Sequence, residues 1–251
     1  MPAGRPRQDA AQRVERAERI LDAAGELILR WGYDKTTIDD VARASHVAKG
    51  TIYLHWRSRE ALFVALLRRE RVGLLAEVER ALAAEPDTAT PAGLLAALAR
   101  ALDRQPIVRA VLVGDREVLG RLGRHTAADP TAAAGRRAFI AYVDELRAHG
   151  LVRDDLSTAE QVAVVAAVFF GFFSVTSFLP DELALREGAL QRLVGETVGR
   201  TLAPARRLRR AEVDEVSRIT MRYVGEFADL ARAEYAKVVG ADEVPTGKDT
   251  E

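Results

Sequence analysis

Apolar residues recur every three or four positions along almost the whole chain, and no stretch alternates β-branched with polar residues. The first pattern gives a helix one apolar face, whereas alternation would be needed for half-buried strands. We therefore expect an all-α protein. The pattern predicts a group of short helices within the first 60 residues. Beyond the loop at residues 85–91 it predicts further helices at about 91–104, 107–113, 115–126, 131–149, 158–178, 182–202 and 209–239.

The N-terminal helices have recognisable start and stop residues. The first helix carries Ile20, Ala24, Leu27, Ile28 and Trp31 at helical spacing and should end at Gly32. Thr37 precedes a short second helix, with Asp40 three residues on, and this spacing predicts a capping box. A tight turn at residues 45–47 leads to a third helix, Lys49 to Trp56. Ser58 should cap a fourth helix that continues to about Ala84.

Net charge and cysteine content narrow the function classes. The formal net charge is zero, so any affinity for nucleic acid must come from a local basic patch. The chain has no cysteine, which excludes disulfides, zinc-thiolate sites and cysteine nucleophiles and fits a reducing compartment. The N-terminus lacks the apolar region of a signal peptide. These features favour a cytoplasmic protein.

The segment KGTIYLHW, residues 49–56, has the composition of a DNA-reading helix. Two short helices joined by a turn and braced by a longer one form a helix-turn-helix, whose second helix enters a major groove. Gly50 would let the backbone approach a phosphate, and Lys49 sits at the helix start, where anions are favoured. Tyr53 could donate to a phosphate and Thr51 could touch a base edge. Ile52 and Trp56 should face inward.

The sequence Gly32-Tyr33 followed by TTIDDVARASHVAKGTIYLHWRSREALF resembles the DNA-binding module of TetR-family transcriptional regulators, over roughly residues 15 to 67. The resemblance implies a homodimer, with a DNA-reading head and a helical body that holds a small ligand in each subunit. It also implies that Thr37 and Arg59 contact phosphates. The DNA-facing set of the third helix, carried over by position, is Lys49, Gly50, Thr51, Tyr53 and His55.

Two residues depart from the family pattern. His46 stands where the turn usually has glycine, and it must tolerate a left-handed backbone if the turn requires one. Ala48 stands where the next helix usually starts on Ser or Thr, which removes a cap worth about 1 kcal/mol. Both departures could alter the DNA target.

The basic segment Gly4-Arg5-Pro6-Arg7 has two interpretations. Arg5 and Arg7 could enter an A·T-rich minor groove as a flexible arm, or belong to a disordered basic tail that adds salt-sensitive attraction.

The stretch from Val162 to Leu179 contains no charged residue, which sits at the lower edge for a membrane span. Its flanks are acidic rather than basic, so we expect no membrane contact and instead burial in the core, at a dimer contact or beside a pocket. The family likeness places the helices at about 158–178 and 182–202 in an intersubunit bundle. The residues expected at this dimer interface are Phe169, Phe173, Leu190, Val194, Thr197 and Val198.

The body is rich in Leu, Ala, Val and Phe, which favours an apolar or amphipathic ligand. The candidate ligand-binding residues are Arg109, Asp115, Arg116, Tyr142, Phe170 and Ser174. The chain offers no nucleophile and base pair, no phosphate loop and no histidine spacing suited to a metal, so we expect no catalytic site, metal or cofactor. Residues 209–239 extend past the usual end of the family layout and could pack on the body or on a partner.

The resulting hypothesis is a ligand-released repressor with three parts: residues 1–60 as arm and DNA-binding domain, 61–240 as ligand-binding and dimerisation domain, and 241–251 as a disordered tail. Its partners would be double-stranded DNA, a second copy of the chain and a small molecule. The alternatives are a ligand-independent regulator or activator with the same head, and a carrier of apolar ligands or membrane-associated protein that keeps the head passively.

Overall fold

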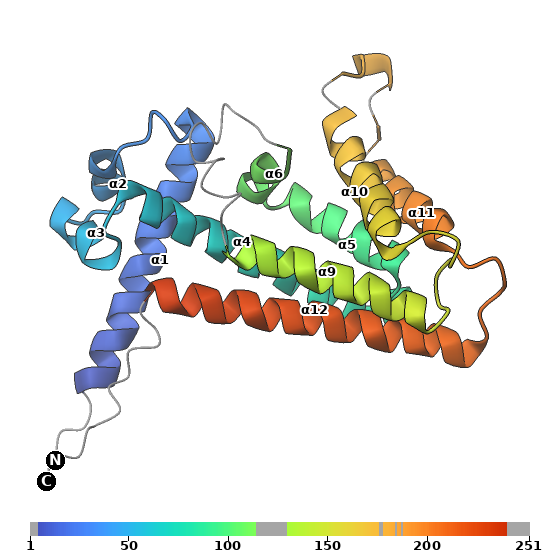
Figure 1. Cartoon of the computed structure of the whole chain (residues 1–251). Helices are drawn as coiled ribbons and strands as arrows, with labels where there is room; N and C mark the ends of the chain where they lie inside the picture. Colours follow the sequence, from blue (N-terminus) through green and yellow to red (C-terminus); the bar gives the residue numbers. More distant parts are fainter. Residues whose placement is uncertain (1–4, 114–129, 176–177, 184, 187, 240–251) are drawn as a thin grey trace, which may run out of the picture.

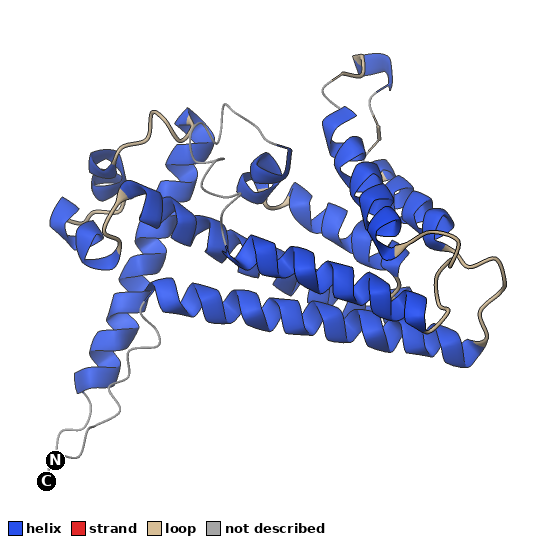
Figure 2. Ribbon diagram, viewed as in Figure 1, coloured by secondary structure: helices blue, strands red, loops and turns tan. Residues whose placement is uncertain are grey.

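The computed structural model describes residues 5–113, 130–175, 178–183, 185–186 and 188–239. Within these ranges the chain is helical and contains no strand (Figure 2). The α-helices are α1 (Arg5–Trp31), α2 (Ile38–Ala44), α3 (Lys49–His55), α4 (Arg59–Ala84), α5 (Pro91–Asp103), α6 (Pro106–Val113), α9 (Pro130–Ala148), α10 (Thr158–Val175), α11 (Ala189–Leu202) and α12 (Arg210–Val239). Short 3-10 turns lie at Pro86–Thr88 and Asp181–Leu183. The prediction of an all-α protein is confirmed.

The first helices form a head at one end of the molecule (Figure 1). Gly32 ends α1 with a φ of 78°, as its sequence position predicts. Helix α1 packs against α2 and α4, and α2 packs against α3. The head has its own hydrophobic cluster, to which α1, α2, α3 and the first turns of α4 all contribute. Its fully buried members include Ile20, Ile28, Val41, Ile52 and Phe63.

The body is a stack of longer helices beside the head (Figure 1). Helix α4 leaves the head and continues into the body, where it packs against α5 and α12. Helix α5 packs on α11, and α9 lies against α10 and α12. A second hydrophobic cluster fills the space between these helices, with Leu82, Leu102, Leu146, Val194 and Ile219 among its buried members.

Helix α12 joins the two clusters. It packs along α4 and α9 of the body and ends beside α1 (Figure 1). Its last residue, Val239, is buried in the head cluster, and Tyr235 and Val238 pack against the same cluster. The core of the head therefore includes residues from far beyond position 60. Ile107 of α6 is buried there as well.

Two helix boundaries differ from the prediction. The helix expected at 182–202 begins only at Ala189, because Gly188 in front of it adopts a left-handed backbone with a φ of 76°. Leu183 lies in a 3-10 turn and is exposed. The segment containing Arg5 and Arg7 is the start of α1, so it is helical instead of being a flexible arm. The helix expected at 115–126 and the tail at 241–251 lie outside the described residues.

Helix α10 is long and apolar enough to cross a membrane, judged by length and composition alone. Only 22% of this helix is buried within the chain, with a mean hydropathy of 1.7. A core helix and a membrane span both pass that test, so it is weak evidence for a membrane. Much of the apolar surface of α10 is therefore not covered by the described part of the chain.

Candidate nucleic-acid interface

The start of α2 is held by a capping box, as predicted. The backbone N–H of Asp40 donates to the Thr37 hydroxyl oxygen over 3.2 Å, and the Thr37 N–H donates to the Asp40 carboxylate over 3.1 Å. The Thr37 hydroxyl also donates to that carboxylate over 2.6 Å. These bonds lower the pKa of Asp40, so the cap stays charged at neutral pH. The hydroxyl proton expected to reach a DNA phosphate is thus bonded to Asp40.

The turn between α2 and α3 shows both departures from the family pattern in three dimensions. His46 has a φ of 54°, the left-handed backbone that glycine usually supplies. The N–H of Val47 closes the turn by donating to the carbonyl of Ala42 over 3.0 Å. Ala48 precedes α3 without any side-chain cap. The N–H of Thr51 donates to the carbonyl of Ala48 over 2.8 Å, so the amides that could meet an anion, such as a phosphate, are those of Lys49 and Gly50.

Helix α3 has one buried and one exposed side. Ile52 is fully buried and Trp56, just after the helix, is 3% exposed, so both belong to the head core as predicted. The exposed side carries Lys49, Gly50 and Tyr53, and Tyr53 is 45% exposed to solvent. Thr51 is partly exposed. A Cβ atom added to Gly50 would meet nothing within 4 Å, so the chain itself gives no packing reason for glycine there.

Lys49 does not stand alone on this face. Its ammonium lies 2.9 Å from the carboxylate of Asp39 in α2. The Lys49 side chain is 50% exposed and the Asp39 side chain 60%. The hydrogen bond and the charge of Asp39 raise the pKa of Lys49. The lysine is fully charged at neutral pH, but a phosphate would have to share it with a carboxylate.

His55 lies on the side of α3 that faces α1. Its ring is 5.2 Å from that of Trp56, and the side chain is only partly exposed. Burial lowers its pKa, and Arg13 and Arg16 of α1 lower it further. His55 is therefore neutral at neutral pH. Its position between α3 and α1 separates it from the outward set of Lys49, Gly50 and Tyr53.

Arg59 is held within the head. Its guanidinium lies 3.9 Å from the centre of the Tyr33 ring and donates to the Tyr33 carbonyl. Tyr33 is itself buried and packs edge-on to Phe63. A cation placed over a buried aromatic ring is attracted to it, so this contact stabilises the packing of α4 against the turn that follows α1. The residue is thus a structural contact within the chain, and any phosphate contact would come in addition.

Two residues of this surface were absent from the predicted set. Leu54 is 78% exposed on the outer side of α3, where an apolar side chain could contact a thymine methyl group. Its position four residues after Gly50 is the sequence signal that could have identified it. Asp39 pairs with Lys49 across the turn, and no local pattern in the sequence indicates this contact.

The predicted ligand residues that the structure describes are spread over three helices, α6, α9 and α10. Arg109 lies 3.8 Å from Asp103 and its guanidinium is 6.0 Å from the Phe173 ring. Phe170 and Ser174 are exposed on α10. Asp115 and Arg116 lie outside the described residues.

Tyr142 belongs to a different part of the body. It is buried on α9, where its hydroxyl lies 2.9 Å from that of Thr220 on α12. Burial raises its pKa, so the hydroxyl stays protonated. The ring lines a groove of about 290 Å³ between α9 and α12. The groove is lined by Ala138, Ala141, Tyr142, Glu145, Ile219, Arg222, Tyr223, Glu226, Phe227 and Leu230.

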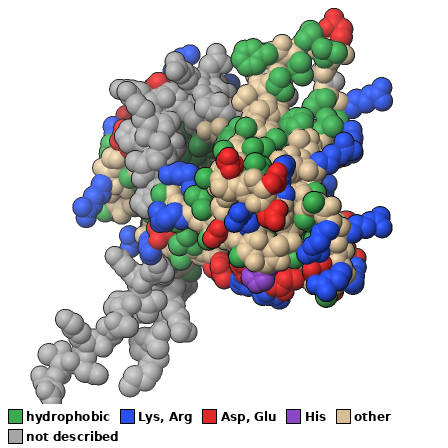
Figure 3. Space-filling view, turned by 45° about the vertical axis from the view of Figure 1, so that its right-hand side comes forward, with side chains coloured by type: hydrophobic (Ala, Val, Ile, Leu, Met, Phe, Trp, Pro, Cys, Tyr) green, Lys and Arg blue, Asp and Glu red, His purple; other side chains and the backbone are tan. Residues whose placement is uncertain are grey.

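Most of the expected dimer residues are buried inside the chain. Phe169, Phe173, Val194 and Val198 are at most 4% exposed and belong to the core of the body. They have almost no surface left for a partner, while Leu190 and Thr197 are partly exposed. The apolar surface of α10 that remains open lies on its other side. It includes Val164, Phe170 and Val175, and Phe178 just beyond the helix is 83% exposed. The space-filling view shows apolar side chains gathered at the upper end of the molecule (Figure 3).

The geometry of α1, α2 and α3 defines a helix-turn-helix protein. Residues 20–66 match the family described as "Bacterial regulatory proteins, tetR family". Residues 20–66 of the chain therefore carry the DNA-binding module of this family of regulators. The family comprises regulators and not enzymes, in line with the expectation that the chain has no catalytic site.

The relatives it resembles have the same module. The chain is 35% identical over 65 residues to the HTH-type transcriptional repressor Rv1474c of Mycobacterium tuberculosis, covering 26% of this chain and 35% of the relative. It is 33% identical over 87 residues to the HTH-type transcriptional activator FasR of Mycolicibacterium smegmatis, covering 34% of this chain and 40% of the relative. The chain spans only about a quarter to a third of the length of the curated relatives it matches.

Among solved structures, the Flavonoid-responsive Regulator FrrA resembles this chain with 24% identity and a TM-score of 0.45, over 76% of this chain and 99% of that one.

Proposed function

We propose that this protein is a cytoplasmic transcriptional regulator that binds an operator as a homodimer and is released from it by a small apolar or amphipathic ligand. The observation that carries the proposal is the two-sided character of α3. Ile52 and Trp56 anchor it in the head core, and Lys49, Gly50 and Tyr53 are left exposed. A helix anchored in this way can enter a major groove without unfolding the head.

In this proposal the outer side of α3 reads DNA. Lys49 and the uncapped first amides of the helix would bind phosphates. Tyr53 would donate its hydroxyl to the backbone, and Thr51 would meet a base edge. Thr37 is bonded to Asp40, and Arg59 lies over the Tyr33 ring. His55 is near Arg13 and Arg16 of α1. We therefore assign these three residues to the edge of the DNA contact.

A homodimer would place two copies of α3 in successive major grooves, about 34–36 Å apart, on a pseudo-palindromic operator. The open apolar side of α10 supports this part of the proposal, since large exposed apolar patches mark association sites. Phe170 lies on that side. We propose this surface, together with the partly exposed Leu190 and Thr197 of α11, in place of the buried residues expected from the sequence.

The ligand would bind in the body and favour a dimer whose heads misfit DNA. The described residues offer the groove beside Tyr142, whose lining rings suit an apolar or aromatic compound. Release requires the ligand to prefer the state that does not bind DNA. A hundredfold loss of DNA affinity corresponds to about 2.7 kcal/mol of differential binding.

Residues 1–60 would act as the reading head and residues 61–240 as the sensing body. This division describes function and does not separate two independent cores. Buried residues of α4, α6 and α12 complete the head cluster, so we expect a fragment of residues 1–60 alone to be unstable.

The test is a gel shift of the protein with the DNA upstream of its own coding sequence, at two salt concentrations. We expect binding that weakens steeply with salt and is abolished by Tyr53→Ala with the helical content intact. Full operator affinity in that variant would remove α3 from the proposed contact. The same assay with apolar aromatic compounds tests release.

Repression and activation can both use this DNA-binding head, since one relative is named a transcriptional repressor and another a transcriptional activator. A transcription assay on the bound promoter decides between them. We favour repression, because occupation of promoter DNA alone is sufficient for it. Activation of transcription upon binding, with no compound that alters affinity, would favour the alternative of a ligand-independent activator.

A further inference from the structure

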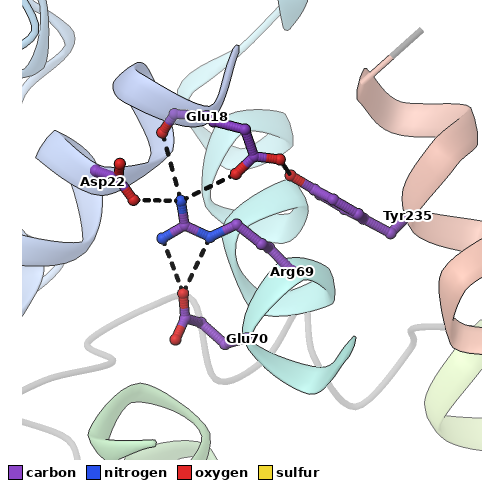
Figure 4. Close-up of polar contacts among 5 residues, drawn as sticks. All are labelled: Glu18, Asp22, Arg69, Glu70 and Tyr235. Atoms are coloured by element: carbon purple, nitrogen blue, oxygen red, sulfur yellow. Dashed lines mark hydrogen bonds and ion pairs between the residues drawn. The ribbon is translucent and has the colours of Figure 1, made fainter. Parts of the chain in front are cut away.

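The last turns of α12 are attached to the head by a shared carboxylate. The hydroxyl of Tyr235 donates to the carboxylate of Glu18 on α1. The guanidinium of Arg69 on α4 lies 3.4 Å from the same carboxylate (Figure 4). Glu18 therefore accepts from two other helices at once. Three segments that are far apart in the sequence meet at this one side chain.

Arg69 extends this junction along α1. It lies 2.6 Å from the carboxylate of Asp22, one turn beyond Glu18, and 2.9 Å from that of its neighbour Glu70 (Figure 4). The Arg69 side chain is 20% exposed, so solvent screens these contacts less than it screens ordinary surface pairs. Burial opposes its charge, and the bonds to Glu70 and Asp22 outweigh that effect and raise its pKa.

A second contact ties α12 to the head end of α4. The guanidinium of Arg68 donates to the backbone carbonyl of Glu234 over 3.3 Å and lies 3.9 Å from its carboxylate. Val239, one turn beyond Tyr235, is 4% exposed within the head cluster. The end of α12 thus combines apolar burial with bonds that fix its direction, as a permanent interface does.

The rest of α12 is fastened to the body. Arg232 lies 2.8 Å from Glu79 in the second half of α4, and the Ser217 hydroxyl donates to the carbonyl of Pro86 over 2.9 Å. The helix has 30 residues and is therefore about 45 Å long. A helix fastened at both ends transmits position between them, since packed helices shift as units.

We infer that α12 sets the orientation of the DNA-reading head on the body, and that Tyr235 is the positioning residue at its tip. The inference rests on the proposed DNA-binding function. Helix α4 also passes from body to head, and Ile107 of α6 packs into the head cluster, but apolar packing of this kind is not directional and permits the head to rotate. The Tyr235–Glu18 bond is made to a different helix, α1, and opposes that rotation. Because α12 also forms one wall of the groove beside Tyr142, a ligand there would act on the same helix.

The first experiment measures how well the protein distinguishes operator spacings. Tyr235→Phe removes one hydroxyl and keeps the ring packed. The dimer then has a less constrained head, so we expect near-normal affinity for the native operator and stronger binding to operators lengthened or shortened by two base pairs. The ratio of native to altered affinity should fall about tenfold, the order expected for one bond to a charged group.

Ser217→Ala is the matched control, because it removes a hydroxyl bond from the same helix at a point away from the head. It should leave the spacing ratio unchanged. If Tyr235→Phe proves poorly folded, Glu18→Gln weakens the same junction from α1 with almost no change in volume. Unchanged spacing ratios in both junction variants would overturn the inference.

The second experiment needs no DNA. The chain has no cysteine, so Glu26→Cys on α1 and Arg100→Cys on α5, both exposed, accept a pair of spin labels. Dilution with unlabelled protein isolates the distance within one subunit. We expect Tyr235→Phe to broaden that distance distribution and Ser217→Ala to leave it unchanged. Superimposable distributions would refute the positioning role. If the unsubstituted protein bound no DNA, the proposed function would fail, and this measurement would still decide the role of α12.

Discussion

The carboxylate of Asp39 lies 2.9 Å from the ammonium of Lys49 across the turn of the helix-turn-helix, so the lysine at the start of α3 is already paired with an acidic side chain. An exposed pair of this kind contributes little to stability. It has a larger effect on binding, because a phosphate that approaches Lys49 also approaches Asp39. If α3 binds DNA as proposed, Asp39 would therefore lower the affinity of Lys49 for a phosphate.

Replacing this carboxylate should strengthen DNA binding. In Asp39→Asn the lysine is freed and one repulsive charge is lost, so we expect affinity to rise about three- to tenfold at low salt, with a smaller gain at high salt. Fluorescence anisotropy with operator DNA at two salt concentrations measures this. Asp214→Asn on α12 makes the same change in net charge and should alter affinity little. Equal gains in both variants would point to net charge and not to the pair.

His55 should make the fold sensitive to mild acid. Its ordinary pKa is 6.5, and burial together with Arg13 and Arg16 lowers it in the folded state. Between the two values the unfolded chain binds more protons, so stability is full above about pH 6.5 and falls as pH drops through the folded pKa. The melting temperature between pH 7.5 and 5.5 should fall less for His55→Gln than for the unsubstituted protein. Equal falls in both proteins would contradict this account of His55.

Local chemistry made much of the head predictable. The capping box needs only Thr37 and Asp40 at the right spacing, and the left-handed backbone of His46 follows from the turn itself. Ile52 and Trp56 could be assigned to the core because they lie four residues apart on a helix whose other side is polar. In each case the deciding interaction lies within one or two turns of chain.

The parts that could not be predicted depend on contacts between distant segments. Helix α10 is apolar on all sides, so its periodicity does not indicate which side faces the core. The family likeness alone assigns Phe169 and Phe173 to a partner, whereas both are buried within the chain. The bond between Tyr235 and Glu18 joins opposite ends of the sequence, and no spacing rule relates them.

The packing of α9 on α12 yields a prediction about two glycines. A Cβ atom on Gly135 would lie 2.6 Å from the Phe227 ring, too close for any contact, so the ring would have to move. We expect Gly135→Ala to destabilise the protein by about 1 kcal/mol, since overpacking costs more than the helix gains from alanine. At Gly225 of α12 an added Cβ meets nothing within 4 Å. Gly225→Ala should therefore stabilise by about 0.5–1 kcal/mol. Urea unfolding of both variants measures the difference, and equal shifts would contradict this account of the contact.

The open side of α10 yields a prediction about assembly. Phe170 is 43% exposed on a helix whose apolar residues are mostly uncovered, and a homodimer would bury it. Phe170→Glu places a charge there, and an unpaired charge buried at an interface costs several kcal/mol. We expect native mass measurements to show the 27.4 kDa monomer for this variant and twice that mass for the unsubstituted protein.

Leu29→Glu is the appropriate comparison for this assembly test, because Leu29 is 44% exposed on α1 of the head. It should leave the dimer intact. DNA affinity should fall steeply in Phe170→Glu alone, since a monomer presents one reading helix and loses the gain from binding two half-sites together. A dimer that survives Phe170→Glu would place the subunit contact elsewhere and leave the apolar side of α10 to another partner.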